Sequence, residues 1–172
     1  YEQALKQAYR LVKKLSEVVL KFAAAYQTEK RSRRVLEFSD LEHYTLSILQ
    51  ENEDIRQDLE ERYAEIMVDE YQDTNQLQET ILTTIARKSP GNMFMVGDVK
   101  QSIYGFRQAM PALFIRRRDA YPDFTGENYP AAITLGNNFR SRPQVTDAVN
   151  FVFRQLMSRE AGGISYDERE EL

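Results

Sequence analysis

Two short apolar runs that end in acidic residues constrain the fold of this chain more than any other feature. Ile66–Val68 ends at Asp69-Glu70, and Met93–Val96 ends at Gly97-Asp98. Apolar runs of this length, each followed by a helix-forming segment, are typical of buried parallel strands. Because ligands of a parallel sheet bind beyond the carboxyl ends of its strands, the acids of both runs should meet at one site.

Helix and strand signals alternate along the second half of the chain. This order predicts an α/β fold, with a parallel sheet flanked by helices and preceded by a helical segment. Apolar periodicity and capping patterns mark the helices, and one further apolar run marks a third strand. The predicted helices run over about 2–36, from the cap Ser39 through Leu49, from the cap Asn52 to 62, and over 77–85, 111–118 and 143–156; the third strand is 132–135. The tail beyond Gly162 should be exposed and frayed.

Composition removes several classes of protein. The chain has no cysteine and one histidine, His43, which excludes disulfides and argues against zinc sites and histidine-based triads. No apolar run approaches the roughly 20 residues of a membrane helix. The net charge of −4 hides two basic stretches, with nine Lys/Arg against four Asp/Glu in 1–37 and five against none in 100–118. A nucleic-acid partner therefore stays open, although solvated helix faces explain the same pattern.

The segment Val68–Asn75, with the sequence VDEYQDTN, carries the most chemical information. A buried strand that delivers two consecutive acids into a cleft is the Walker B arrangement of ATPases. Asp69 can hold Mg²⁺, and Glu70 can accept a proton from the water that attacks the γ-phosphate. An Asp-Glu pair alone fits a solvated turn equally well. The later segment 97–104, GDVKQSIY, argues against coincidence.

Together these segments resemble the superfamily 1 DNA helicases of the UvrD/RecB kind. Among them the chain is most similar to the A subunits of bacterial ATP-dependent helicase–nucleases, the AddA or RexA family. The resemblance rests on Phe38–Leu41, Val68–Asn75, Val96–Phe114, Asn137–Arg142 and Gly163–Asp167. It implies a partial RecA-like (P-loop NTPase) sheet, with Mg²⁺ and ATP as cofactors in the parent protein.

The resemblance also implies roles for the residues that match the nucleotide site. Asp69 would bind Mg²⁺, and Glu70 would be the general base. Gln101 would sense the γ-phosphate, Arg140 would reach it from across the cleft, and Phe139 would lie near the nucleotide base. For Arg140 alone, a surface ion pair is the plainer alternative.

A second set of matching residues implies contact with DNA. Tyr104 and Phe106 would stack on bases of single-stranded DNA, a contact that tolerates any sequence because every base has a π-face. Arg107 follows them on the same short segment. Taken alone, the two rings could equally be core aromatics, and His43 is best explained as a structural residue.

The sequence departs from a complete ATPase in one respect. It contains no Gly-x-x-x-x-Gly-Lys-Ser/Thr loop, so we expect the isolated chain to lack ATPase activity. We expect an internal part of a longer protein, in which 1–62 belongs to a helical insertion of the first motor domain. Residues 63–135 would form the second half of that RecA-like domain, and 136–172 would start the second motor domain. An exposed sheet edge would then favour self-association.

These expectations combine into one functional hypothesis. The chain would be a fragment of an ATP-dependent DNA helicase/exonuclease subunit that moves 3′ to 5′ on single-stranded DNA in double-strand-break repair and recombination. Its partners would be DNA and a second, AddB/RexB-like subunit, without a membrane, in the bacterial cytoplasm. A non-catalytic DNA- or protein-interaction module derived from such a helicase is the alternative. Another superfamily 1 repair helicase ranks lower, because those usually carry Trp at the Phe106 position.

Overall fold

The computed structural model describes residues 2–158, 160, 164–168 and 170–172, which divide into two units, 1–44 and 45–172. Each unit is treated by itself below. The elements are α1 (Glu2–Arg33), α2 (Phe38–Glu51), α3 (Glu53–Arg62), β1 (Ile66–Val68), η1 (Tyr71–Asp73), α4 (Gln76–Ile85), β2 (Met93–Met95), η2 (Val99–Gln101), η3 (Gly105–Arg107), α5 (Pro111–Ala120) and α6 (Pro143–Leu156), where η denotes a 3-10 helix. None of the helices within the described ranges is long and apolar enough to span a membrane.

The junction between α1 and α2 differs from the sequence prediction. α1 ends at Arg33 rather than near Leu36, because Arg34 takes a left-handed conformation (φ 55°) and the Val35 N–H bonds back to the Lys30 carbonyl at 3.1 Å. α2 begins at Phe38, so Ser39 is not its cap.

A capping contact at the start of α2 comes from Asp40, whereas the sequence predicted Ser39 as the cap. Its carboxylate accepts the Glu37 N–H at 2.9 Å and both its oxygens lie 2.7 Å from the Lys30 ammonium. Backbone donation from Glu37, followed by the Lys30 hydrogen bond, holds the pKa of Asp40 below its usual value. The start of α2 is therefore set by a buried ion pair, which local capping patterns do not reveal.

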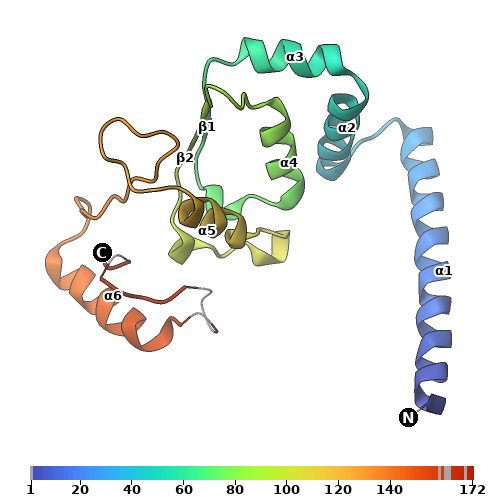
Figure 1. Ribbon diagram of the computed structural model, residues 1–172. Helices are drawn as coiled ribbons and strands as arrows, with labels where there is room; N and C mark the ends of the chain where they lie inside the picture. Colours follow the sequence, from blue (N-terminus) through green and yellow to red (C-terminus); the bar gives the residue numbers. More distant parts are fainter. Residues whose placement is uncertain (1, 159, 161–163, 169) are drawn as a thin grey trace. The chain divides into compact units, whose positions relative to one another are not determined.

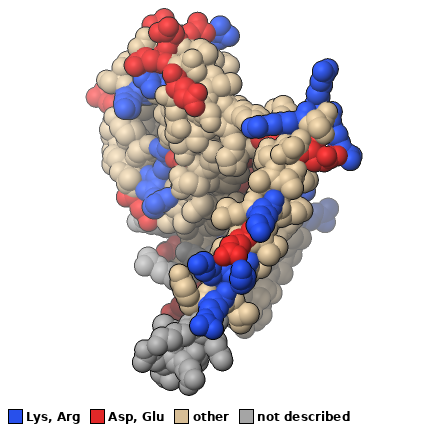
Figure 2. Space-filling view, turned by 90° about the vertical axis from the view of Figure 1, so that its right-hand side faces the viewer, with Lys and Arg blue, Asp and Glu red and all other residues tan. Residues whose placement is uncertain are grey.

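α1 carries an apolar face that nothing covers within the described part of its unit. Seven of its large apolar side chains are more than 60% exposed: Tyr9, Leu11, Val12, Leu15, Val18, Leu20 and Phe22. Figure 2 shows Lys and Arg side chains spread along the same helix. The predicted amphipathic helix thus forms.

In the second unit, β1 and β2 form a parallel pair with Ile66 opposite Met93 and Val68 opposite Met95. The parallel sheet predicted from the alternation of elements is confirmed. α4 makes the crossover between the strands (Figure 1), and it begins with a capping box in which the side chains and backbone N–H groups of Asn75 and Gln78 satisfy each other.

The predicted third strand, 132–135, is wrong. Ala132 makes one isolated bridge to Asp123, and the Ala132 N–H and carbonyl bond to the Pro122 carbonyl and the Phe124 N–H at 2.8 and 2.9 Å. These two bonds tie Ala132 back to the start of the 122–132 loop, and no strand forms at 132–135. Ile133 and Leu135 are 62% and 84% exposed.

The described part of the tail is docked, in contrast to the frayed end expected from its composition. Ile164 is 4% exposed, and the Asn150 side chain on α6 accepts the Leu172 N–H at 3.0 Å and the Tyr166 hydroxyl at 2.6 Å. Glu170 pairs with Lys100 at 3.2 Å and with Arg118 at 2.8 Å. Ion pairs therefore hold the end of the chain against Lys100 and Arg118, although its acidic composition is typical of a solvated tail.

Candidate functional site

The two acidic motifs meet at one edge of the strand pair, as their positions in the sequence predict. Beyond β1 and β2 the ladder continues with the Val96 N–H bonding to the Val68 carbonyl and the Tyr71 N–H bonding to the Val96 carbonyl, both at 2.9 Å. α5 packs against η1 and η2 at this carboxyl edge (Figure 1). The segment after β1 and the segment after β2 are thereby fixed side by side.

Asp69 and Glu70 are both exposed at this edge. Glu70 has φ 49° and ψ 42°, a left-handed conformation that turns the chain out of the strand direction, and its N–H donates to Asp69 Oδ1 at 2.9 Å. Consecutive residues of a straight strand point to opposite faces. Because the chain turns at Glu70, the side chains of Asp69 and Glu70 are not forced onto opposite faces, and both can reach the same site.

The carboxylate of Asp69 fits the ligand chemistry of Mg²⁺. One of its oxygens accepts the Glu70 N–H, and the other has no protein partner among the residues described. The same residues contain no group of three or more metal-ligating side chains. Mg²⁺ is commonly held by one or two carboxylates together with water and substrate phosphates, so a single free carboxylate oxygen suits it.

Gln72 connects the two motifs. This residue is 1% exposed, its Nε2 donates to Glu70 Oε2 at 2.6 Å, and its Oε1 accepts the Asp98 N–H at 2.9 Å. Gly97 leaves room for this contact, because a Cβ there would lie 2.5 Å from Gln72 Oε1 and 3.1 Å from the Tyr71 nitrogen. Neither Gln72 nor Gly97 has a role that was predicted from the sequence.

Asp98 organises the loop that carries Gln101. Its carboxylate accepts the Lys100 N–H and the Gln101 side-chain amide, each at 3.0 Å, and pairs with the Lys100 ammonium at 2.9 Å. Burial alone would raise the pKa of Asp98, but the hydrogen bonds from Lys100 and Gln101 outweigh it and hold that pKa below its usual value. Asp98 therefore stays ionised and keeps Gln101 tied to the loop.

Asp73 is the exception in this region. Its Oδ1 is buried and has no hydrogen-bond partner in the described structure. Burial, and after it the charge of Glu70, raises the pKa of the Asp73 carboxyl.

A buried polar network of Tyr71, Glu79 and Arg117 lies next to the site. Tyr71 is 0% exposed, its hydroxyl bonds to the Glu79 carboxylate, and Arg117 Nε lies 2.9 Å from that hydroxyl and 3.0 Å from Glu79 Oε1. Burial and the bond to Glu79 raise the pKa of Tyr71. The Tyr71 ring meets Phe114 of α5 edge-on at 5.7 Å. This network anchors η1 to α4 and α5, and periodicity along single helices does not indicate it.

The aromatic pair after η2 lies on the surface. Phe106 is 78% exposed and Tyr104 is 39% exposed, and their ring centroids are 5.9 Å apart. The Arg107 guanidinium lies over both rings, at 5.5 Å from Tyr104 and 5.6 Å from Phe106. The alternative that these rings belong to the core is therefore wrong.

Phe139 and Arg140 lie on the segment before α6. Phe139 is 94% exposed, and Arg140 is exposed with its backbone N–H bonded to Asn138 Oδ1 at 3.0 Å. The Arg140 side chain makes no ion pair with any residue in the described ranges, so the surface ion pair considered for it is not formed. The structure does not join this segment to Glu70 or Gln101 by hydrogen bonds.

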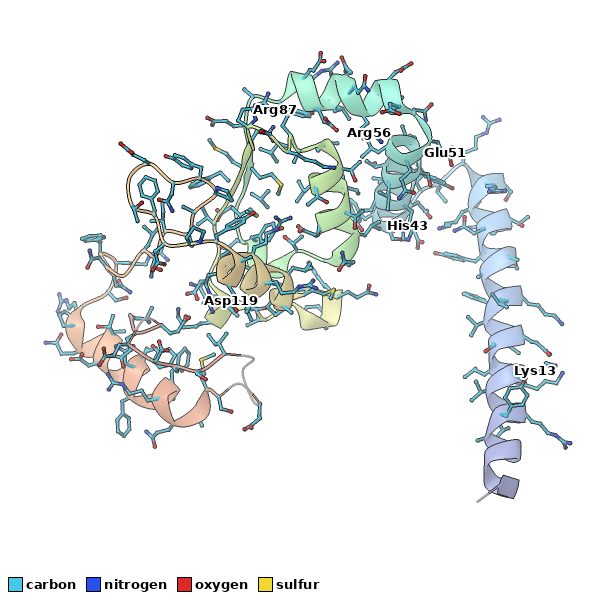
Figure 3. The ribbon with its side chains drawn as sticks, in the orientation of Figure 1. Lys13, His43, Glu51, Arg56, Arg87 and Asp119 are labelled. Carbon is cyan, nitrogen blue, oxygen red and sulfur yellow. The ribbon has the colours of Figure 1, made fainter. Side chains whose placement is uncertain are left out.

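The first unit has a hollow of about 500 Å³ that is lined by residues between 26 and 44. His43, labelled in Figure 3, lines it, and its ring Nδ1 is 2.7 Å from the Ser39 carbonyl one turn earlier. The Lys30 ammonium in its wall is already paired with Asp40 and Glu37. The charge of Lys30 is thus used within the fold, and the ring of His43 contacts the backbone of its own helix.

Comparison with known proteins identifies the family. Residues 2–122 match the UvrD/REP helicase N-terminal domain. The chain belongs to the UvrD/REP helicase family. It is 55% identical over 163 residues to the A subunit of the ATP-dependent helicase/nuclease of Ligilactobacillus salivarius, which covers 92% of this chain and 13% of that protein. The corresponding A subunit of Clostridium acetobutylicum is 44% identical over 181 residues, which covers 99% of this chain and 14% of that protein.

The family assignment confirms the resemblance drawn from the motifs. This UvrD/REP chain spans only 13% to 14% of the length of these relatives. The range that matches the helicase domain, 2–122, contains both motifs. Gln72 could not have been singled out beforehand, because the burial of one glutamine among several is a property of the tertiary structure. Gly97 had a usable signal, since glycine at a strand end often marks close backbone approach.

Proposed function

We propose that this chain is part of the ATP-hydrolysing motor of a longer helicase–nuclease subunit. The observation that supports this most is the hydrogen-bonded series Glu70–Gln72–Asp98–Gln101, which joins the DEYQD and GDVKQ motifs at the carboxyl edge of a parallel sheet. Substrates of such sheets bind at that edge. The relatives, which are named as A subunits of ATP-dependent helicase/nucleases, agree with this proposal.

In the proposed reaction, each side chain has a task that its geometry permits. Glu70 is exposed and has one oxygen fixed by Gln72, so its second oxygen can accept a proton from the attacking water. Asp69 offers a carboxylate oxygen to Mg²⁺, which when bound would neutralise charge on the phosphates. Gln101 would contact the γ-phosphate and so sense its presence. Arg140 and Phe139 would approach the nucleotide from the segment before α6.

The same proposal covers the rest of the longer protein. Residues 1–62 belong to a helical insertion of the first motor domain, 63–135 to the second half of a RecA-like domain, and 136–172 to the start of the second motor domain. The longer protein moves 3′ to 5′ on single-stranded DNA in double-strand-break repair and recombination, in the bacterial cytoplasm, with a second AddB/RexB-like subunit. Tyr104, Phe106 and Arg107 contact the DNA strand, because their exposed rings and cation suit base stacking.

The test is ATP turnover stimulated by single-stranded DNA in the full-length protein. Glu70→Gln should lower kcat by roughly 10²- to 10⁴-fold, the usual contribution of a general base. Glu65→Gln, at the amino end of β1, is the matched control and should turn over ATP normally. The 172-residue chain alone should be inactive, because its sequence lacks the glycine-rich phosphate loop. Full activity of the Glu70→Gln protein would instead favour the interaction-module alternative.

A further inference from the structure

Gln72 is one of the most deeply buried side chains in the described structure, and it links the motif after β1 to the motif after β2. It is 1% exposed, whereas Glu70 and Gln101 are exposed. A buried primary amide is costly unless its donors and acceptors are used. Gln72 uses both ends of its amide, at 2.6 Å to the Glu70 carboxylate and at 2.9 Å to the Asp98 N–H.

The direction of both bonds is fixed by chemistry. An ionised carboxylate can only accept, so the Gln72 nitrogen must face Glu70. A backbone N–H can only donate, so the Gln72 oxygen must face Asp98. The two demands agree, and a flipped amide would lose both hydrogen bonds at once. The orientation of this side chain is therefore determined without ambiguity.

The surrounding backbone leaves Gln72 little freedom to move. The Tyr71 N–H is bonded to the Val96 carbonyl at 2.9 Å, which pins the residue before Gln72 to the end of β2. Gly97 faces the Gln72 oxygen so closely that even a methyl group there would lie 2.5 Å from it. Rigid packing of this kind is what holds a reacting group in place.

We propose that Gln72 is a positioning residue: its amide holds the carboxylate of Glu70 in place for proton transfer and ties it to the loop that carries Gln101. This inference rests on the proposed function, in which Glu70 is the general base. One Glu70 oxygen is held by the Gln72 nitrogen, and the other stays available for water. Asp98 extends the series, because its N–H binds Gln72 while its carboxylate binds Gln101 at 3.0 Å. A movement of the Gln101 loop is thereby passed to the base through three hydrogen bonds.

The experiment replaces Gln72 by the near-isosteric Met in the full-length protein. Asn92→Leu is the matched control, because Asn92 is 7% exposed and also bridges two backbone groups, accepting the Arg87 N–H at 2.8 Å and donating to the Tyr63 carbonyl at 3.0 Å. Figure 3 shows Arg87 near the α3 end of the strand pair, opposite the carboxyl edge. Both variants lose a buried amide with two hydrogen bonds, and only Gln72→Met loses it beside Glu70.

Gln72→Met should lower kcat by about 10- to 100-fold, the usual effect of removing a group that orients a reacting side chain. The KM for ATP should stay within about twofold, since the interaction lost acts on the reacting base and not on nucleotide binding. The stimulation of turnover by single-stranded DNA should also fall. Asn92→Leu should lose comparable thermal stability and keep kcat, KM and DNA stimulation.

The inference is overturned if Gln72→Met loses stability like Asn92→Leu but keeps kcat and DNA stimulation, or if it raises KM alone. Should Gln72→Met fail to fold, Gln72→Glu decides, because it keeps the oxygen that accepts from Asp98 and removes the N–H given to Glu70. A fall in its kcat at constant KM supports the inference, and normal turnover rejects it. Glu70→Gln, measured in parallel, separates the two proposals: unchanged turnover there rejects the proposed function itself.

Discussion

Gly97→Ala tests the close approach between the two motifs. The new Cβ would lie 2.5 Å from Gln72 Oε1, about 0.9 Å closer than ordinary contact, and 3.1 Å from both Phe114 Cε1 and the Tyr71 nitrogen. Two of these three neighbours belong to η1, which cannot withdraw freely because its Tyr71 N–H is bonded to the Val96 carbonyl just after β2. Overpacking of this kind costs about 1–3 kcal/mol. Displacing Gln72 from the Asp98 N–H adds about 1 kcal/mol.

The free energy of unfolding of the 172-residue chain should therefore fall by about 2–4 kcal/mol, which at typical urea m-values lowers the midpoint by about 1–2 M. Gly91→Ala is the control, because the nearest atom to its new Cβ is the Arg87 carbonyl oxygen at 4.0 Å. Both substitutions restrict the unfolded chain equally, so that contribution cancels in the comparison. Equal urea midpoints for the two variants would refute the reasoning.

Three further outcomes follow from the same structure. Tyr71→Phe removes the hydroxyl that Arg117 contacts at 2.9 Å and should cost about 1–3 kcal/mol by thermal unfolding. Phe106→Ala should weaken single-stranded DNA binding by the full-length protein by about 1–3 kcal/mol in a titration, whereas Phe151→Ala, also exposed, should not. The pKa of Asp98 is lowered in the fold, so its stabilisation is complete above about pH 4 and lost as pH falls through the folded value. The difference in urea midpoint between wild type and Asp98→Asn should accordingly shrink below about pH 4.

The strands and the meeting of the motifs could be read from the sequence because each depends on a local pattern. An apolar run ending in acids specifies β1 and the edge where Asp69 lies, and the residues at 75–78 specify the start of α4. The start of α2 and the docking of the tail were predicted wrongly because both depend on ion pairs between residues that are separated in the sequence. Asp40 forms an ion pair with Lys30, ten residues away in the sequence, and Glu170 forms one with Lys100, seventy residues away. Neither pairing follows from a periodic or capping pattern, because those patterns relate residues only two to four positions apart.

Individual site residues were predicted unevenly for a related reason. Residue type and motif spacing point to Glu70 and Gln101, whose chemistry is visible in their side chains. The residue that joins them, Gln72, is one of several glutamines in the sequence, and its burial, which the sequence does not show, sets it apart from them. The 132–135 run was misread because apolarity without a partner strand does not make a strand.

The parallel pairing of β1 with β2 has a consequence for synthesis of the chain on the ribosome. Ile66 pairs with Met93, 27 positions later. At the usual 5–20 residues per second, β1 waits roughly 1–5 s for its partner to be made. α4, with its capping box, lies wholly within that interval, and helices form in about a microsecond. The crossover can therefore be in place before the second strand exists, and the newly made strand is added beside the waiting one.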